Sequence, residues 1–206
     1  MTDKRISEHS QREWIPSRRL SKNGRVIVIS EAESTDALDL VSYVEQVSDE
    51  SDFLSFGPGE FGISVQEERN ILCDYRSAKN KLYLLARISG RIVGALSFQG
   101  GSRPRMSHSG ELAMSVIQEH WSEGIGAALL EEFLGWCSAT DVIKKVNLHV
   151  RTDNDKALAL YRKKGFSIEG TVTMDMCVRG VYYDHHIMGL TLEPTYAEQE
   201  GAASNP

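Results

Sequence analysis

VIQEHWSEGIGA, residues 116–127, joins the end of a β-prone segment to the start of an apolar helical stripe. Gly124 and Gly126 let the main chain approach a ligand and leave no side chain in the way. The free N–H groups of a first helical turn, aided by the helix dipole, form a site for phosphate. A tight strand-to-helix turn that binds nothing is the alternative, because the pattern is neither a Walker loop nor a full dinucleotide fingerprint.

The periodicity on both sides of this turn predicts an α/β (α+β) domain, with a mixed central sheet of about seven strands and helices on both faces. The expected strands lie at residues 26–29, 82–88, 91–98, 111–116, 146–150, 166–173 and 181–192, and the expected helices at residues 37–47, 64–78, 124–137 and 154–164. The resulting order is β-α-α-β-β-β-α-β-α-β-β. Its strand, helix, strand succession near the middle requires a right-handed parallel crossover.

Local signals mark several element boundaries. Ser34 or Thr35 is expected to cap the first helix, and Ser64–Glu67 has the form of a capping box for the second. Ser89-Gly90 predicts a two-residue hairpin turn in which Gly supplies a positive φ.

The composition excludes several classes of protein. The chain has 206 residues, 23 Lys and Arg against 29 Asp and Glu, and a net charge of −6. This acidic balance predicts no nucleic-acid partner, because duplex binding depends on Lys and Arg that neutralise phosphates. No apolar stretch approaches the roughly 20 residues of a membrane-spanning helix, and the N-terminus lacks a signal-peptide core. A cytoplasmic protein with no membrane partner is expected.

The chain is expected to form one domain, residues 25–192, between two polar ends. Residues 1–24 are rich in charge and poor in aliphatic side chains, which predicts a flexible N-terminal arm, although Trp14 could dock on the domain. Residues 193–206 are polar and acidic and predict a tail.

No metal is expected. The three cysteines show no zinc-ligand spacing and are odd in number, which favours reduced, buried thiols; they are Cys73, Cys137 and Cys177. His108, His120 and His149 show no metal spacing either, which favours solvated or packed histidines.

A second motif, Asn154-Asp155-Lys156-Ala157-Leu158-Ala159-Leu160-Tyr161-Arg162-Lys163-Lys164-Gly165-Phe166, lies one strand beyond the glycine turn. Together the two motifs resemble the acyl-CoA-binding core of the GCN5-related N-acetyltransferase (GNAT) superfamily. Its first motif is Arg/Gln-x-x-Gly-x-Gly/Ala, and its later motif is Asn-x-x-Ala-x-x-Leu-Tyr-x-x-x-Gly-Phe, which this chain matches at each named position. The resemblance covers about residues 25–192, and the Trp-x-x-Gly-Ile-Gly form is similar to a bacterial subgroup whose substrates are mostly unassigned.

The resemblance implies the GNAT fold and acetyl-CoA as cosubstrate, with no metal. It implies that main-chain amides from Ser122 to Ala127 cradle the pyrophosphate and that the strand Met114–Val116 binds the pantetheine arm. This strand and the one that carries Leu148 would splay apart around the thioester. The implied cofactor-binding residues are Met114, Ser115, Val116, Trp121, Ser122, Glu123, Gly124, Ile125, Gly126, Ala127, Asn154 and Tyr161.

Three residues depart from the first motif. Trp121 replaces the usual Arg or Gln, Ser122 stands where Gly is frequent, and Glu123 brings a negative charge near the expected pyrophosphate. These departures do not affect the fold expectation, and because main-chain amides do most of the cradling, the expectation of acetyl-CoA binding is kept. The Ser122 hydroxyl can donate a hydrogen bond, and Glu123 is expected to point to water.

The chemistry of amine acetylation predicts three catalytic groups. An amine with a pKa near 10.4 is almost entirely protonated at neutral pH, so a base is needed. Glu111 resembles the strand glutamate that acts as this base, often through water, in several members. A main-chain N–H, with Val116 as a candidate, would stabilise the oxyanion. The resemblance implies that Tyr161 faces the sulfur, where its phenol could donate a proton to the leaving thiolate. The structural alternatives are a cross-strand pair for Glu111 and a core tyrosine for Tyr161.

The acceptor side carries weaker signals. His185 and His186 lie with Tyr182 and Tyr183 on the last strand, and since neighbours on a strand face opposite ways, at most one histidine can enter the site. Glu60, Glu67 and Glu68 could attract an amine, but a solvated helix face is the favoured interpretation. The acceptor, a small-molecule or peptide amine, stays unidentified.

The sequence thus predicts an N-acetyltransferase in which a primary amine directly attacks acetyl-CoA within a ternary complex. A non-catalytic acyl-CoA sensor or interaction module with the same fold is the rival hypothesis, and a site for another phosphorylated ligand is a third. Oligomeric state is open, and the last strands could pair across a homodimer.

Overall fold

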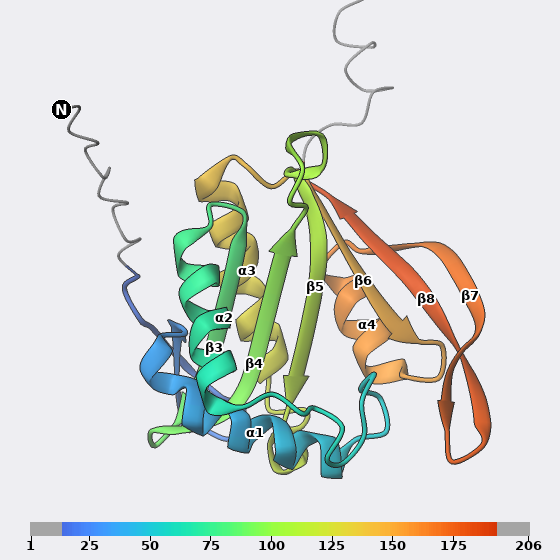
Figure 1. The fold of residues 1–206 in the computed structure, drawn as a ribbon, viewed down its shortest axis with the longest axis horizontal. Coiled ribbons are helices and arrows are strands. Elements are labelled where there is room, and N and C mark those ends of the chain that lie inside the picture. Colours follow the sequence, from blue (N-terminus) through green and yellow to red (C-terminus); the bar gives the residue numbers. More distant parts are fainter. Residues whose placement is uncertain (1–13, 193–206) are drawn as a thin grey trace, which may run out of the picture.

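The computed structural model describes residues 14–192 as an eight-stranded mixed sheet with four α-helices (Figure 1). The strands are β1 Ser17–Leu20, β2 Val26–Glu31, β3 Lys81–Ile88, β4 Arg91–Gly100, β5 Ser109–Val116, β6 Lys145–Arg151, β7 Ser167–Val178 and β8 Val181–Thr191. The helices are α1 Ala37–Glu50, α2 Val65–Ser77, α3 Ile125–Thr140 and α4 Asp155–Lys163. In the sheet order β1-β2-β3-β4-β5-β6-β8-β7, only β5 and β6 run parallel.

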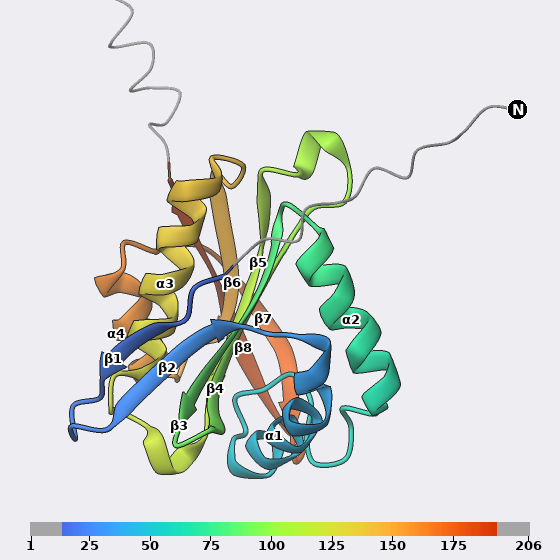
Figure 2. The same cartoon turned by 90° about the vertical axis from the view of Figure 1, so that its left-hand side faces the viewer.

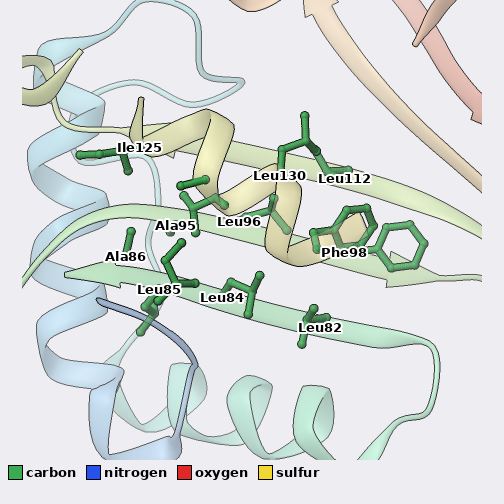
Figure 3. Packing of buried hydrophobic residues seen from close by; sticks show 14 of the residues in the cluster. Leu82, Leu84, Leu85, Ala86, Ala95, Leu96, Phe98, Leu112, Ile125 and Leu130 are labelled. Atoms are coloured by element: carbon green, nitrogen blue, oxygen red, sulfur yellow. The ribbon is translucent and has the colours of Figure 1, made fainter. Parts of the chain in front are cut away.

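The helices cover both faces of the sheet. Figure 2 shows α1 and α2 on one face and α3 and α4 on the other. Buried aromatic rings pack between the sheet and α3, where Phe98 of β4 lies 5.0 Å from Phe133 and 6.2 Å from Trp136, measured between ring centroids. Figure 3 shows Leu82, Leu84 and Leu112 of the sheet in the same cluster. The apolar stripe expected on this helix therefore forms its contact with the sheet.

The main sequence predictions of architecture are confirmed. The mixed sheet and the expected order of elements are present from β2 onward, and α3 links the parallel strands β5 and β6. Ser89 (φ 51°) and Gly90 (φ 86°) form the tight turn between β3 and β4. The capping box is also present, because the Ser64 hydroxyl accepts from Glu67 N–H and the Glu67 carboxylate accepts from Ser64 N–H.

The prediction that residues 1–24 form a flexible arm is wrong for residues 17–20, which form a strand. The sheet therefore has eight strands rather than about seven. Ser17–Leu20 forms β1, which pairs antiparallel with β2. This strand buries little apolar surface, and Leu20 is 71% exposed. It is held by main-chain pairing and by contacts of Ser17 and Arg19 with α3, features that composition does not report. Residues 1–13 and the predicted tail lie outside the described residues.

Trp14 packs against the core, as the sequence allowed. Two smaller predictions are wrong. A 3₁₀ turn at Ser34–Asp36 precedes α1 and makes Asp36 its N-cap residue, so neither Ser34 nor Thr35 caps the helix. Of the cysteines only Cys137 is buried, whereas Cys73 and Cys177 are exposed.

Candidate functional site

The parallel strands β5 and β6 separate after a short contact. They pair only from Ser109 with Lys145 to Glu111 with Asn147. Figure 1 shows the two strands side by side at one end and apart at the other. The splay that the resemblance implied is therefore present, and Glu111 lies at the point of divergence.

The edge of β5 that faces this divergence carries free main-chain donors. Ile117 N–H donates to Val93 C=O at 3.1 Å, and Val116 lies opposite Gly94. Only alternate residues of an antiparallel strand bond to a given neighbour. The N–H groups of Met114 and Val116 therefore point away from β4, toward the side of β6.

Ser115 is placed differently from its neighbours in β5. The alternation turns its main-chain groups toward β4. Its hydroxyl lies 2.9 Å from the Tyr43 hydroxyl of α1. The structure thus uses Ser115 to attach β5 to α1, and its role in cofactor binding stays a prediction.

The turn before α3 exposes a run of main-chain donors. Ser122 (φ 66°) and Gly124 (φ 95°) both adopt left-handed conformations that curl the chain into the helix. Among the described residues, no hydrogen-bond acceptor is found for the N–H groups of Ser122 and residues 124–127, and the first helical bond runs from Ala128 N–H to Gly124 C=O. Five free amides at a helix N-terminus fit an anion such as a diphosphate.

The two glycines of the turn have different roles. A Cβ at Gly124 would meet only Cγ of Lys22, at an uncrowded 4.0 Å, but the φ of +95° disfavours any L residue. A Cβ at Gly126 would lie 3.3 Å from both Leu160 and Met114. Gly126 therefore allows α3, α4 and β5 to approach one another, and only Gly124 shapes the amide cradle directly.

Glu123 does not point to water, so that prediction is wrong. Its side chain is buried, and its carboxylate accepts from Asn23 Nδ2 at 2.8 Å and lies 3.2 Å from His120 Nδ1. The acid is therefore directed at the β1–β2 turn and at its own 3₁₀ turn. Ser122 is exposed, which leaves its hydroxyl accessible to a ligand.

Trp121 connects the turn to the end of β5. Its indole Nε1–H donates to Val116 C=O at 2.7 Å, which occupies an acceptor on the diverging edge and fixes the ring. The Lys156 ammonium lies 5.5 Å from the centroid of this ring. Trp121 thus positions the end of β5 and brings one cation of α4 to the turn, although it carries no charge itself.

Helix α4 contributes Asn154 and Tyr161. Asn154 is its N-cap, with the side-chain oxygen accepting from Ala157 N–H at 3.2 Å. Tyr161 is buried against Phe166, and no hydrogen bond of its hydroxyl is found among residues 14–192. Burial raises the pKa of Tyr161 to about 12, so the phenol is protonated at neutral pH.

Asn154 variants separate capping from cofactor binding. Asn154→Asp keeps the oxygen that caps α4 but loses the amide donor, whereas Asn154→Ala loses both. We expect the alanine variant to lower the free energy of unfolding by about 1 kcal/mol and the aspartate variant to retain it. If the amide also binds pantetheine, both variants weaken acetyl-CoA binding in calorimetry. Unchanged affinity in Asn154→Asp would leave Asn154 with a structural role alone.

Glu111 lies on the same face of β5 as Ser115, the face that contacts α1 through Tyr43. Glu111 is exposed and lies opposite Gln99 and Asn147 on the neighbouring strands. Glu68 is buried, so the prediction of a solvated helix face is wrong for it, and this burial raises its pKa. Glu60 and Glu67 are exposed.

The histidine pair on β8 splits as alternation requires. His185 shares the register of Arg151 and lies 3.1 Å from the Asp175 carboxylate, whereas His186 contacts the Thr171 hydroxyl at 2.9 Å. Burial lowers the pKa of His185. His108 and His149 are exposed, and His120 is buried.

No group of three or more His, Cys, Asp or Glu side chains within residues 14–192 could hold a metal ion. Within the same range, no helix has both the length and the apolar character to cross a membrane.

Comparison with known proteins identifies the class. The Acetyltransferase (GNAT) family matches residues 49–166, more than half of the chain. A GNAT-family acetyltransferase structure from Streptococcus pneumoniae is 33% identical with a TM-score of 0.79, and the match covers 81% of this chain and 99% of that one. The chain belongs to the GNAT family of acetyltransferases.

The names of proteins similar to this chain state different acetyl acceptors. L-amino acid N-acetyltransferase AaaT of Escherichia coli is 33% identical over 51% of this chain and 65% of its own. Spermidine N(1)-acetyltransferase of Vibrio cholerae is 30% identical over 37% of this chain and 44% of its own. The chain therefore spans less than two thirds of these relatives. The structure of yncA from Salmonella typhimurium with its cofactor acetyl-CoA has the same fold at 15% identity, with a TM-score of 0.72, covering 82% of this chain and 95% of that one.

Sequence reasoning missed the residues that pack around the turn. Tyr43, Lys156 and Asn23 all contact residues of the predicted cofactor site. Only Asn23 carried a usable signal, because Asn-Gly is a strong marker of a hairpin turn and Gly24 has a φ of 77°.

Proposed function

We propose that this protein is an acetyl-CoA-dependent N-acetyltransferase that acts on a primary amine. The observation that carries the proposal is the set of free amides at Ser122 and residues 124–127, beside the diverging edges of β5 and β6. When bound there, acetyl-CoA would supply an acetyl group activated as a thioester. The amides would bind its diphosphate, and the free edge of β5 would bind its pantetheine arm.

The catalytic roles follow from the positions of three groups. The Met114 and Val116 amides face the divergence and can stabilise an oxyanion. Glu111 is five residues before Val116, or about 16 Å along a strand, which exceeds the reach of one bridging water, so it would act as a base through a chain of waters. The Met114 amide is nearer, at about 10 Å along the same strand. The alignment of amine and thioester would supply much of the rate enhancement.

Tyr161 would stabilise the departing thiolate. A phenol with a pKa of about 12 is a weaker acid than a thiol, whose ordinary pKa is about 8.5. Full proton transfer from this tyrosine would therefore be uphill in the unliganded environment. We propose that Tyr161 donates a hydrogen bond to the sulfur as the thiolate forms and keeps its own proton, so that the thiolate leaves stabilised by this bond.

One of the two observations that favoured a non-catalytic sensor no longer supports it. The sensor hypothesis rested on Trp121 and on a negative charge at the pyrophosphate, but the Glu123 carboxylate binds Asn23. Release of free thiol from acetyl-CoA in the presence of an amine panel tests the two directly. Thiol release with at least one amine supports the transferase, and binding without release supports the sensor. Stabilisation by unrelated nucleotides but not by CoA would indicate another phosphorylated ligand.

Glu111→Gln tests the proposed base. We expect a loss of kcat/KM of about 10²-fold, because the uncharged amide cannot accept a proton from the ammonium or its bridging water. The loss should shrink at high pH, where more of the amine is already neutral. Glu119→Gln is the matched control, since Glu119 is also exposed and lies on the turn after β5. A Glu111→Gln profile that parallels the wild type at all pH values would rule out the base.

A further inference from the structure

The hairpin turn between β1 and β2, residues 21–25, lies against the amide cradle. Lys22 N–H donates to Glu123 C=O at 2.9 Å, and Asn23 Nδ2 donates to the Glu123 carboxylate at 2.8 Å. Glu123 is the residue directly before Gly124. A segment about 100 residues away in sequence is thus bonded to the centre of the predicted cofactor site.

The hairpin is fixed along α3 as well as at the turn. The Ser17 hydroxyl donates to Glu132 at 2.8 Å, and Arg19 forms ion pairs with Glu131 at 3.0 Å and Glu132 at 3.3 Å. Figure 2 shows β1 alongside α3. Ser21 is 5% exposed, and its hydroxyl accepts from Arg25 N–H at 3.1 Å, so the turn itself has a defined shape.

This arrangement places one free cation beside the cradle. The only heavy atom within 4 Å of a Cβ built at Gly124 is Cγ of Lys22, at 4.0 Å. From Cγ the flexible stem lets the ammonium extend about 4 Å further. Lys22 is exposed, and no ionic partner for it is found among the described residues.

The local charges give this cation a role. The motif position that usually carries Arg or Gln holds Trp121, which is uncharged, and the following acid Glu123 is turned into its contacts with Asn23 and His120. Lys156, a cation of α4 near the turn, lies over the Trp121 ring. A diphosphate on the amides would therefore meet a cation from β1–β2 that the two motifs do not contain.

We propose that the β1–β2 turn completes the cofactor site, with Lys22 supplying a positive charge to the diphosphate and the bonds to Glu123 holding Lys22 in place. The inference rests on the proposed function, because it assumes that acetyl-CoA binds at residues 122–127. It adds a binding residue from outside the region that the family match covers, residues 49–166.

Calorimetric titration of Lys22→Gln, Lys22→Arg and Arg18→Gln with three ligands tests this role. Arg18 is the matched control, since it is exposed on the same hairpin but alternates away from Ser17 and Arg19, which contact α3. We expect Lys22→Gln to weaken binding of acetyl-CoA and of dephospho-CoA about five- to tenfold at low salt, with the difference lost near 0.5 M salt. Acetylpantetheine, which lacks the diphosphate, should bind equally to all variants, and Lys22→Arg should restore most of the affinity.

The outcomes separate this inference from the function on which it rests. Equal acetyl-CoA affinity of Lys22→Gln and Arg18→Gln, with tight binding by the wild type, would overturn the inference alone. A Lys22→Gln effect on acetyl-CoA that vanishes with dephospho-CoA would overturn the assignment to the diphosphate, because the 3′-phosphate would then be the contact. Absence of acetyl-CoA binding by the wild type would overturn both.

Discussion

Gly124→Val is expected to reduce acetyl-CoA affinity by about 100-fold or more. Gly124 has a φ of +95°, in the region that L residues disfavour and that a β-branched side chain tolerates least. Valine would force the turn into another conformation, and the amides of residues 124–127 would then no longer point toward a single bound diphosphate. Because several charge-assisted hydrogen bonds would be lost together, the effect on affinity should exceed that of any single side chain.

Gly135→Ala is the control for this variant. Gly135 lies inside α3, and a Cβ there meets nothing within 4 Å. Alanine should raise the free energy of unfolding by about 1 kcal/mol and leave acetyl-CoA affinity unchanged. Calorimetry and thermal unfolding of both variants measure the contrast. A folded Gly124→Val protein with wild-type affinity would contradict the role of this turn.

Tyr161→Phe is expected to lower kcat by about 10²-fold while acetyl-CoA affinity changes little. The ring packs 5.6 Å from that of Phe166, and phenylalanine preserves this packing. Only the hydroxyl is removed, and among the described residues it has no hydrogen-bond partner that would stabilise the fold. The loss should therefore appear in the step that releases the thiolate.

The pH dependence of kcat gives a second test of the role of Tyr161. Because burial raises the pKa of Tyr161 to about 12, its hydroxyl stays protonated throughout the neutral and mildly basic range. The ratio of wild-type to Tyr161→Phe kcat should thus stay constant from about pH 6 to pH 10. Tyr182→Phe, at a 59% exposed tyrosine, is the control and should keep wild-type kcat. Equal kcat of Tyr161→Phe and wild type would assign Tyr161 to the core.

The sequence predicted the parts of the fold that depend on periodicity and turn chemistry. The stripe on α3, the capping box at Ser64 and the turn at Ser89-Gly90 are each local, and the structure confirms all three. β1 was missed because its stability comes from pairing with β2 and from ion pairs to α3. The ion pairs join residues more than 100 positions apart, so no local pattern reports them.

The site was predictable where it depends on the main chain. The local pattern of a strand that leads into a helix was enough to predict the glycine turn and the strand before it. The family resemblance predicted that β5 and β6 diverge. The direction of individual side chains was not predictable. Glu123 and Glu68 read as solvated acids, but tertiary packing buries both, and Ser115 is turned to Tyr43 by strand alternation.

In the proposed function, main-chain amides at the start of α3 bind the diphosphate of acetyl-CoA without a side chain. Backbone amide NMR of the isotope-labelled protein, titrated with acetyl-CoA and in parallel with acetylpantetheine, tests it most directly. We predict that the largest acetyl-CoA shifts fall on Ser122 and residues 124–127 and that acetylpantetheine leaves these resonances in place. Saturating acetyl-CoA that shifts other parts of the protein but not these amides would contradict the account.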